Sequence, residues 1–168
     1  TPDDVNNGST DNCTLPGNLI LSLDVNSWDC SELGPHTVTL TVEDEVGLTH
    51  TATAVVTVIA PTTTFSAGTW TPNAPHLGST AVVNDAYSPS VDGIIDSCLC
   101  EVTASGTLNV NGGTYIRSSR DITVNGSLMV DPQGSVLQID DLANTVNNGD
   151  ITVQMNTPNM AAKSFMVS

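Results

Sequence analysis

Residues 105–153 read SGTLNVNGGTYIRSSRDITVNGSLMVDPQGSVLQIDDLANTVNNGDITV, and this stretch decides the fold class. Short apolar segments recur in it about every seven residues, separated by turns that contain glycine. The segments are Leu108–Val110, Tyr115–Arg117, Ile122–Val124, Leu128–Val130, Val136–Ile139, Thr145–Val146 and Ile151–Val153, and the turns are Asn111-Gly112-Gly113, Asn125-Gly126, Gln133-Gly134 and Asn148-Gly149. This spacing is too short for helices and too regular for chance, so it predicts a series of short strands.

Such short strands cannot bury a face alone, so they must stack on copies of themselves. Three of them would make a coil of roughly 21 residues, as in a β-solenoid. We therefore expect a short parallel β-helix of about two coils. The residues that lie above one another would be Leu108, Met129 and Ile151 in one column, and Tyr115 and Val136 in another. A two-faced solenoid with a coil of about 14 residues, which would stack Leu108, Ile122 and Val136, is the alternative.

The composition fits thin β-architecture. The chain has 168 residues with 39% apolar but only 4% aromatic side chains, and no segment shows a helical apolar period over three turns. No run approaches the roughly 18 apolar residues that a membrane span needs. The net charge is −15, and Arg117, Arg120 and Lys163 are the only basic residues. Because binding to a nucleic-acid backbone requires such cations, we expect no nucleic-acid partner.

Residues 1–60 predict a second all-β unit. Apolar and polar residues alternate over 19–25, 37–42 and 52–58, and an acidic turn at Glu43–Gly47 separates the last two segments. Threonine on one side and aliphatic residues on the other are typical of a half-buried sheet, and we expect a small immunoglobulin-like β-sandwich. Such a small core usually needs a cross-link. Cys13 and Cys30 predict a disulfide that would stabilise the unit by roughly 3 kcal/mol.

The run DNC…LSLDV…WDCSELGPHTVTLTVEDEVGLTHTATAVVTV resembles the hyalin-repeat, immunoglobulin-like modules of giant Bacteroidota surface proteins. The motifs that carry the resemblance are Asp11-Asn12-Cys13, Asp29-Cys30-Ser31, Leu33-Gly34 and the strand Thr37–Val42, followed by Asp44 and a strand rich in Thr, Ala and Val. The resemblance covers roughly residues 3–59. It implies a stalk or adhesive module without catalytic residues. It departs from the family where Val58-Ile59-Ala60-Pro61 replaces the usual Val-x-Asp.

Acidic residues near the start of the chain are candidates for a structural calcium site. Asp3, Asp4 and Asn6 lie around a glycine turn, and Asp11 and Asp44 would converge on them if the loops gather at one end of the sandwich. Calcium favours such hard oxygen ligands. The same residue types also form plain turns, and the spacing is not that of an EF-hand loop. We expect no other cofactor.

Residues 61–97 are expected to form a linker and a cap for the solenoid, which would then occupy residues 98–168. Ala60–Thr64 has linker composition, and the following segment is rich in Pro, Gly and Asn. Trp70 is expected to plug the open end of the first coil, because solenoids need capping. The alternative places Trp70, with Tyr115 or Tyr87, on an exposed face that binds surface glycans.

Cys98-Leu99-Cys100 allows three states. In a strand both cysteine side chains would point to one face, at a separation too long for an unstrained bond. A strained local disulfide, two buried thiols and a bond to another chain are all open. The local disulfide is favoured because extracellular conditions oxidise close thiols.

The segment GTW…ITVNGSLMVDPQGSVLQIDD…NNGDITV…TPNMAAKSFMV is similar to a solenoid-like module of secreted Bacteroidota proteins, found near the type IX secretion sorting signal. The best matches are Gly126-Ser127-Leu128, Gly134–Gln138 and Ser164-Phe165-Met166. In that family further sequence follows Phe-Met, so the resemblance implies a solenoid that continues beyond residue 168 and a secreted, cell-surface location.

The function expected from these observations is that of a non-catalytic structural or adhesive module in a large secreted bacterial surface protein or extracellular filament. Its partners would be neighbouring modules or neighbouring subunits, joined by strand addition at the last coil. A carbohydrate-binding accessory module is the alternative. A polysaccharide lyase or hydrolase fragment is a more remote one: Asp131, Asp140 and Asp141 lie near the bases Arg117 and Arg120, but no familiar catalytic motif occurs.

Overall fold

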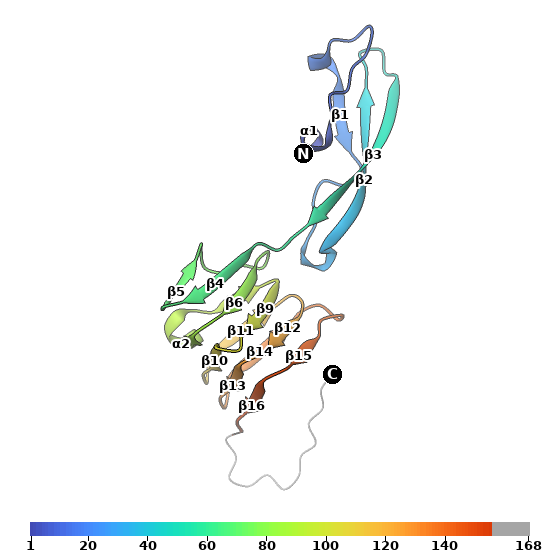
Figure 1. Ribbon diagram of the computed structural model, residues 1–168. Coiled ribbons are helices and arrows are strands. Elements are labelled where there is room, and N and C mark those ends of the chain that lie inside the picture. The colour runs from blue at the N-terminus through green and yellow to red at the C-terminus, as the bar shows by residue number, and fades with distance from the viewer. Residues whose placement is uncertain (156–168) are drawn as a thin grey trace. The chain divides into compact units, whose positions relative to one another are not determined.

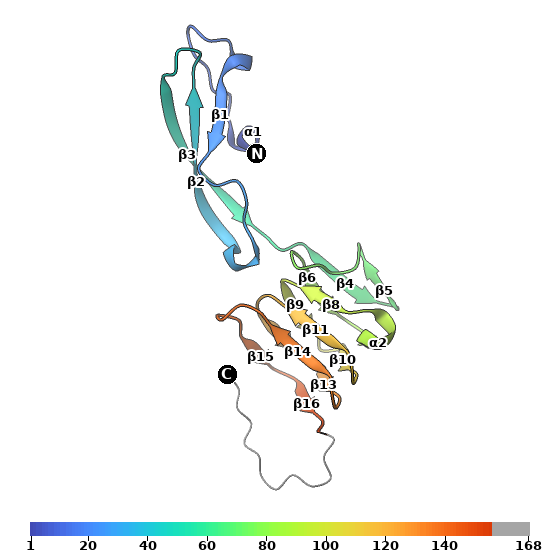
Figure 2. The same ribbon diagram turned by 180° about the vertical axis from the view of Figure 1, so that it is seen from behind.

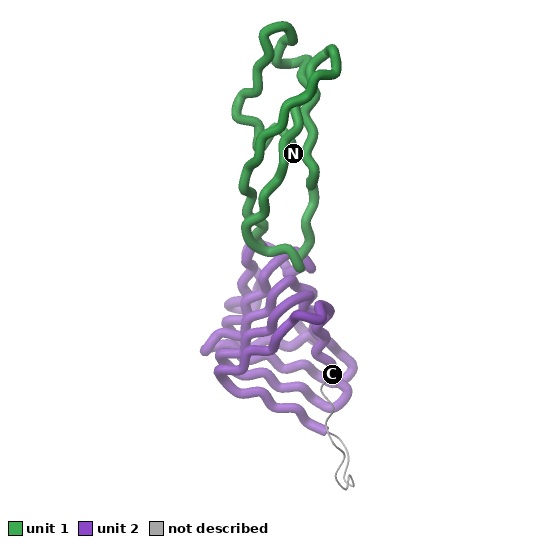
Figure 3. The backbone as a smooth tube through the Cα atoms, turned by 90° about the vertical axis from the view of Figure 1, so that its right-hand side faces the viewer, with its two compact units in different colours: residues 1–59 green, residues 60–168 purple. Residues whose placement is uncertain are grey.

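The computed structural model describes residues 1–155 and confirms an all-β fold (Figure 1). The chain divides into two compact units, coloured separately in Figure 3. Unit 1 is Thr1–Ile59, and unit 2 begins at Ala60. Each unit is described by itself.

Unit 1 is built around one antiparallel sheet. Its elements are α1 (Pro2–Val5), the 3-10 helix η1 (Pro16–Asn18), β1 (Ile20–Leu23), the 3-10 helix η2 (Cys30–Glu32), β2 (Gly34–Glu43) and β3 (Thr49–Val58). The strand order is β1-β2-β3, so the long hairpin β2–β3 carries β1 on one side only. The two hairpin strands pair without interruption from Gly34↔Val58 to Glu43↔Thr49.

The alternation predicted for the hairpin strand β2 is confirmed. Val38 and Leu40 are buried, whereas Thr37 is exposed and Thr39 is half-buried. The side chains of a strand point alternately to its two faces, so the aliphatic residues share the inner face. The turn Asp44–Leu48 closes the hairpin, with the Asp44 carboxylate accepting hydrogen bonds from the backbone N–H groups of Val46 and Leu48.

The predicted immunoglobulin-like sandwich is not confirmed. A sandwich needs a second sheet against the first. Within unit 1 the structure contains a single three-stranded sheet, and the segment 24–33, which would have to supply part of another sheet, forms loop and η2 instead. That segment lacks the alternating apolar residues that a strand requires.

Unit 2 is a parallel solenoid preceded by a short hairpin. Its elements are β4 (Thr62–Ser66), β5 (Thr69–Thr71), β6 (Thr80–Val83), β7 (Ala86–Tyr87), α2 (Pro89–Asp92), β8 (Ile95–Ser97), β9 (Leu99–Val102), β10 (Thr107–Val110), β11 (Tyr115–Ser118), β12 (Ile122–Val124), β13 (Ser127–Val130), β14 (Ser135–Gln138), β15 (Thr145–Asn147) and β16 (Asp150–Val153). All seven strands predicted between residues 108 and 153 are present.

Apart from β5, which pairs antiparallel with β4, these strands form three parallel ladders. The first sheet has the order β15-β12-β9-β6-β4-β5, the second β16-β13-β10-β7 and the third β14-β11-β8. Successive strands of the chain visit the three sheets in turn, which makes three complete coils, β6–β8, β9–β11 and β12–β14, and the beginning of a fourth (Figures 1 and 2). The predicted three-faced parallel β-helix is thus confirmed, and the two-faced alternative is wrong.

Columns of aliphatic side chains fill the interior of the solenoid. In the first sheet one column runs Ala81, Cys100, Ile122 and a second runs Val83, Val102, Val124. Each of these side chains is at most 2% exposed. In the second sheet Tyr87, Leu108, Leu128 and Ile151 stack in register. The interior is therefore a narrow packed core with no room for a channel.

The predicted column of Leu108 and Ile151 is confirmed, because both stack on Leu128, but Met129 and the predicted pair Tyr115–Val136 are each wrong by one position. Leu108 pairs with Leu128, and Met129 pairs with Asn109 on the outer face. Likewise Tyr115 pairs with Ser135, while Ile116 pairs with Val136. Thr107 and its partner Ser127 are 20 residues apart in sequence, whereas Ser127 and Asp150 are 23 apart. A coil assumed to be 21 residues long therefore places a side chain on the wrong face, because the strand period is two.

The segment 61–97 is mostly part of the solenoid. β4 pairs in parallel with β6, so Thr62–Ser66 is a rung of the first sheet and not a linker. β6, β7 and β8 form a complete coil before residue 98. The Pro, Gly and Asn content that suggested a linker belongs to the corners between these short strands. The predicted solenoid residues 156–168, including Ser164-Phe165-Met166, lie outside the described residues.

Glycines allow the coils to approach one another at the corners. A Cβ atom added to Gly126 would lie 2.2 Å from the Thr103 carbonyl oxygen and 2.3 Å from the Gly106 carbonyl oxygen. Gly149 is in the same situation, 2.1 Å from the Gly126 carbonyl oxygen. Backbone Gly126 and Asp150 carry the ladder through this corner, since the Asp150 N–H donates to the Gly126 carbonyl at 2.8 Å. Only glycine fits such a close backbone contact.

Replacing Gly126 by alanine is predicted to destabilise unit 2 by about 3 kcal/mol or more, because the new methyl group overlaps backbone atoms that cannot rotate away. Chemical denaturation followed by circular dichroism measures the change. Gly17→Ala is the control: a Cβ there has no atom within 4 Å, and its φ is not left-handed. It should change stability by no more than about 0.5 kcal/mol. Equal effects of the two variants would contradict the close-packing interpretation.

Candidate functional site

Three aromatic side chains gather at the first rungs of the solenoid. Phe65 and Tyr87 are buried, and Trp70 on β5 is half-buried against the same core. The ring centroids lie 4.6 Å (Phe65–Tyr87) and 5.4 Å (Phe65–Trp70 and Trp70–Tyr87) apart, with tilted or edge-on geometry. Such ring–ring contacts stabilise the fold beyond what the burial of the rings alone contributes. Trp70 is thus part of an aromatic cluster of Phe65, Trp70 and Tyr87 that closes this end of the core.

The polar atoms of the aromatic cluster are also used internally. The Trp70 indole N–H donates to the Tyr87 hydroxyl at 3.4 Å. The Tyr87 hydroxyl donates to the carbonyls of Gly93 (2.7 Å) and Asp92 (3.2 Å). Burial raises the pKa of Tyr87. These bonds leave few polar groups of the cluster available to orient a ligand.

Tyr115, the other aromatic ligand candidate, lies elsewhere. It begins β11 in the third sheet, is half-buried, and pairs with Ser135. It has no ring contact with another aromatic side chain in the part of the chain that the structure describes. Trp70 and Tyr115 therefore do not form the row of aromatic side chains that a glycan-binding face would present.

The cysteines pair differently from the prediction. Cys30 and Cys98 are disulfide-bonded, whereas Cys13 is an exposed free thiol and Cys100 a buried one. The predicted Cys13–Cys30 bond and the predicted Cys98–Cys100 bond are both wrong. A separation in sequence gives the entropy of closing a loop, but it does not say where the Cβ atoms point.

Cys100 behaves as an apolar side chain. It is 2% exposed and stacks between Ala81 and Ile122 in the first sheet. Burial, with a smaller contribution from the charge of Glu101, raises the pKa of the thiol to about 12. Since the thiolate is the reactive form, Cys100 is inert in the folded protein.

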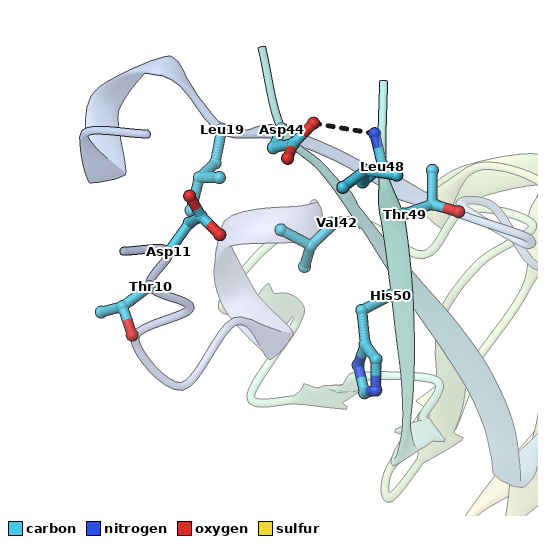
Figure 4. Close-up of a pocket in the computed structure, with 8 residues that line it drawn as sticks. All are labelled: Thr10, Asp11, Leu19, Val42, Asp44, Leu48, Thr49 and His50. Atoms are coloured by element: carbon cyan, nitrogen blue, oxygen red, sulfur yellow. Dashed lines mark hydrogen bonds between the residues drawn. The ribbon is translucent and has the colours of Figure 1, made fainter. Parts of the chain in front are cut away.

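Asp11 and Asp44, two of the predicted calcium ligands, line one pocket of unit 1 (Figure 4). The other lining residues are Thr10, Leu19, Val42, Leu48, Thr49 and His50. Asp11 already accepts hydrogen bonds from the backbone N–H groups of Cys13 and Thr14, both at 2.7 Å, and these bonds lower its pKa. Asp44 accepts from Leu48, as the dashed line in Figure 4 shows. Both carboxylates thus act as turn acceptors.

Two of the remaining calcium candidates, Asp4 and Asn6, also accept hydrogen bonds within local turns. Asp4 accepts a hydrogen bond from the Thr1 hydroxyl at 2.7 Å, and Asn6 accepts from the N–H and hydroxyl of Ser9. Asp3, Asp4 and Asn6 do not line the pocket that contains Asp11 and Asp44. Among residues 1–155 no group of three or more His, Cys, Asp or Glu side chains is arranged to hold a metal ion. The predicted convergence of the five residues is not found.

The acidic and basic residues considered for catalysis are spread over several strands and corners of unit 2. The Arg117 Nε atom lies 2.7 Å from the Asp96 carboxylate on the neighbouring rung, and the Arg120 Nε atom lies 3.5 Å from the Asp140 carboxylate. Asp131 is at the corner between β13 and β14, where its carboxylate accepts from the Asn111 side chain at 3.3 Å. Asp131 and Asp140 therefore do not face each other across a common groove, as acid–base cleavage of a glycan would need.

A second pocket lies in unit 2 beside β4. Its lining residues are Pro61, Thr62, Thr63, Pro72, Asn73, Ala74, His76 and Ser79. Two of its hydroxyls are already bonded: Thr63 donates to the Asn73 carbonyl, and Ser79 donates to the His76 carbonyl at 2.9 Å. None of the residues that line this pocket carries a charged side chain, and together they do not indicate a particular ligand or reaction.

Sequence reasoning missed a polar ladder along the corner after the first sheet. The Asn148 amide donates to the Asn125 carbonyl oxygen at 2.9 Å, and the Asn125 amide donates to Glu101 at 3.0 Å. One coil earlier, at the same corner, the Thr103 hydroxyl donates to the Asn84 side-chain carbonyl at 2.8 Å. The signal was present, because Asn125-Gly126 and Asn148-Gly149 occupy the same place in successive coils. This ladder links coils and satisfies its own polar groups.

The fold and these sites define a short, three-faced parallel β-solenoid with an attached antiparallel sheet. Comparison of the chain with protein-family models, with curated proteins and with solved structures finds no match. None of the helices in residues 1–155 is long and apolar enough to cross a membrane.

Trp70→Ala is predicted to destabilise unit 2 by about 2–4 kcal/mol, because it removes a half-buried ring from the aromatic cluster. Thermal and denaturant unfolding measure the change. Tyr115→Ala is the matched comparison, since it removes a half-buried aromatic ring outside the cluster, and its effect should be smaller. A Trp70→Ala protein of unchanged stability would show that the ring does not close the core.

Thiol labelling is predicted to separate the four cysteines into three classes. Without reductant, an alkylating reagent should modify Cys13 in the native protein and Cys100 only after denaturation. Cys30 and Cys98 should react only after denaturation and reduction. Peptide mass spectrometry reads each site. Labelling of Cys30 without reductant, or protection of Cys13, would contradict the observed pairing.

Proposed function

We propose that the chain is a non-catalytic structural or adhesive module of a secreted bacterial surface protein or extracellular filament. The observation that carries the proposal is the difference between the two ends of the solenoid. At the first rungs the aromatic cluster covers the core. At the last described rungs inward positions are accessible: Val153 is 50% exposed, and Thr145 and Asn147 are exposed as well.

The last strand of a parallel ladder has unpaired backbone groups that can bind another strand. The strands β14, β15 and β16 each end a ladder in the described residues, so each has a strand neighbour on one side only. Unpaired strand edges are templates for strand addition. We propose that later sequence of the same chain or a neighbouring subunit continues the stack here, as a stalk or filament requires.

The charge and the cysteines support a location outside the cell. Disulfide-bonded Cys30 and Cys98 fit an oxidising compartment. The only basic residues are Arg117, Arg120 and Lys163, and the first two lie half-buried in a strand and at a corner of the solenoid. Trypsin-like proteases therefore find few accessible cleavage sites in the described part of the chain. An immunoglobulin-like relationship of unit 1 stays a hypothesis that rests on the sequence motifs around Cys13 and Cys30.

The two alternatives have less support. A carbohydrate-binding module would use Trp70 or Tyr115, but Trp70 packs within the aromatic cluster and Tyr115 is apart from it. A glycan lyase or hydrolase would need opposed carboxylates, and Asp131 and Asp140 occupy separate corners, each in contact with another side chain.

Antibodies raised against the 168-residue chain are predicted to label intact, unpermeabilised producing cells or fibres shed from them. Immunogold electron microscopy makes the measurement, with a cytoplasmic protein as the control for cell integrity. The purified chain should release no sugar from neutral or acidic polysaccharides. Labelling that requires permeabilisation, or release of sugar that a catalytic-carboxylate variant such as Asp140→Asn abolishes, would contradict the proposal.

A further inference from the structure

The longest strand edge of unit 1 has no neighbour. β3 spans Thr49–Val58 and is hydrogen-bonded to β2 on one side, at the end of the order β1-β2-β3. No backbone group of β3 bonds to any element other than β2 within residues 1–155. Its residues are exposed or half-buried throughout, and Val55 is 69% accessible.

β3 lacks every feature that normally protects an edge strand. Proteins block edges with charged residues, proline, bulges or short strands. β3 contains no Asp, Glu, Lys, Arg or Pro in its sequence THTATAVVTV. The ten pairs with β2 run without a bulge. The opposite edge is different, because β1 has four residues and is followed by Asp24, whose side chain accepts a hydrogen bond from the Thr39 N–H at 2.8 Å.

We propose that β3 pairs with β3 of a second copy of this chain, antiparallel and about a two-fold axis, to form a continuous six-stranded sheet. Two copies that each carry a charge of −15 can come together only where acidic side chains are absent, and β3 is a ten-residue edge without charge. A partner of positive charge would be attracted to the acidic turns and not to this edge. The interaction is additional to the proposed continuation of the solenoid and does not involve unit 2.

The side chains of β3 are self-complementary in this arrangement. With the two-fold axis at Thr53, each β3 residue lies opposite a β3 residue of the other copy whose side chain is on the same face of the sheet. Thr53 is then opposite Thr53 of the other copy, and Thr51 is opposite Val55. Cross-strand pairs of threonine and β-branched residues are favourable. On the other side Ala52 meets Ala54, whose small side chains let the strands approach. An isologous contact of this kind closes as a dimer and cannot propagate.

The test measures self-association of the full 168-residue chain by sedimentation velocity or light scattering over a range of concentrations. The wild type should form dimers. Thr53→Lys should weaken the dimer by about a hundredfold, because like charges would lie directly opposite at the axis. This variant lowers the net negative charge, so general repulsion cannot explain a loss of dimer. Mixing Thr53→Lys with Thr53→Glu should restore dimers, as opposite charges then face each other.

Thr39→Lys is the matched control, since Thr39 pairs with Thr53 on the same face of the sheet but lies on the central strand β2. It should keep the wild-type dimer, and circular dichroism should show that both lysine variants are folded. A monomeric wild type, a dimer that survives Thr53→Lys, or a dimer broken equally by Thr39→Lys would overturn the proposal. The surface-labelling experiment is independent of these outcomes, so failure of one leaves the other standing.

Discussion

The close approach of successive coils at glycine corners is the constraint on which unit 2 depends. The ladder requires each strand to lie at hydrogen-bonding distance from the strands before and after it, and this distance must hold through the corners as well. Gly106, Gly126 and Gly149 meet that requirement at the corner between the first and second sheets. Gly112 and Gly134 do the same at the next corner, where added Cβ atoms would lie 2.5 and 2.3 Å from carbonyl oxygens.

The narrow interior follows from that geometry. Each coil contributes a few inward side chains, so stability comes from repetition of small contacts between neighbouring coils rather than from one large core. A stack of this kind must be closed at its ends, because the first and last rungs have a neighbour on one side only. The aromatic cluster supplies this closure at one end with three rings. At the other end, inward positions above Ile122 and Val124 are occupied by Thr145 and Asn147, which are less costly to expose than aliphatic residues.

The sequence predicted strands better than it predicted their stacking. The spacing of apolar segments and Asn-Gly or Gly-Gly turns located seven strands of unit 2, since these signals are local. The stacking depends on coil length, which varies with the number of residues at each corner: Thr103–Gly106 connects β9 to β10, but Asn125-Gly126 alone connects β12 to β13. A difference of one residue in the coil exchanges inner and outer faces. No pattern in the sequence fixes that number in advance.

Contacts between distant residues were the hardest to predict. The five candidate calcium ligands were grouped because their residue types suit calcium, but four of them, Asp4, Asn6, Asp11 and Asp44, accept local hydrogen bonds instead. The cysteine partners were chosen by proximity in sequence, which carries no information on where the cysteine side chains point. Trp70 packs against the core, as the plug interpretation expects, because an uncovered end of a solenoid has a definite physical cost. The packing of Trp70 against Phe65 and Tyr87 was not recognised, since the three residues have no regular spacing in the sequence.

The corner between β14 and β15 shows that the solenoid accepts extra residues between its strands. It contains Ile139–Asn144, whereas Ser119–Asp121 forms the equivalent corner one coil earlier, and both keep their flanking strands in register. Loop closure costs little more as a loop lengthens, about 0.6 kcal/mol for each doubling. The solenoid therefore separates two tasks: its rungs hold the chain in place, while this corner accepts extra sequence. Foreign peptides inserted between Asp141 and Ala143 would be displayed on the flank without disturbing the ladder, and natural variation in length is expected to gather there.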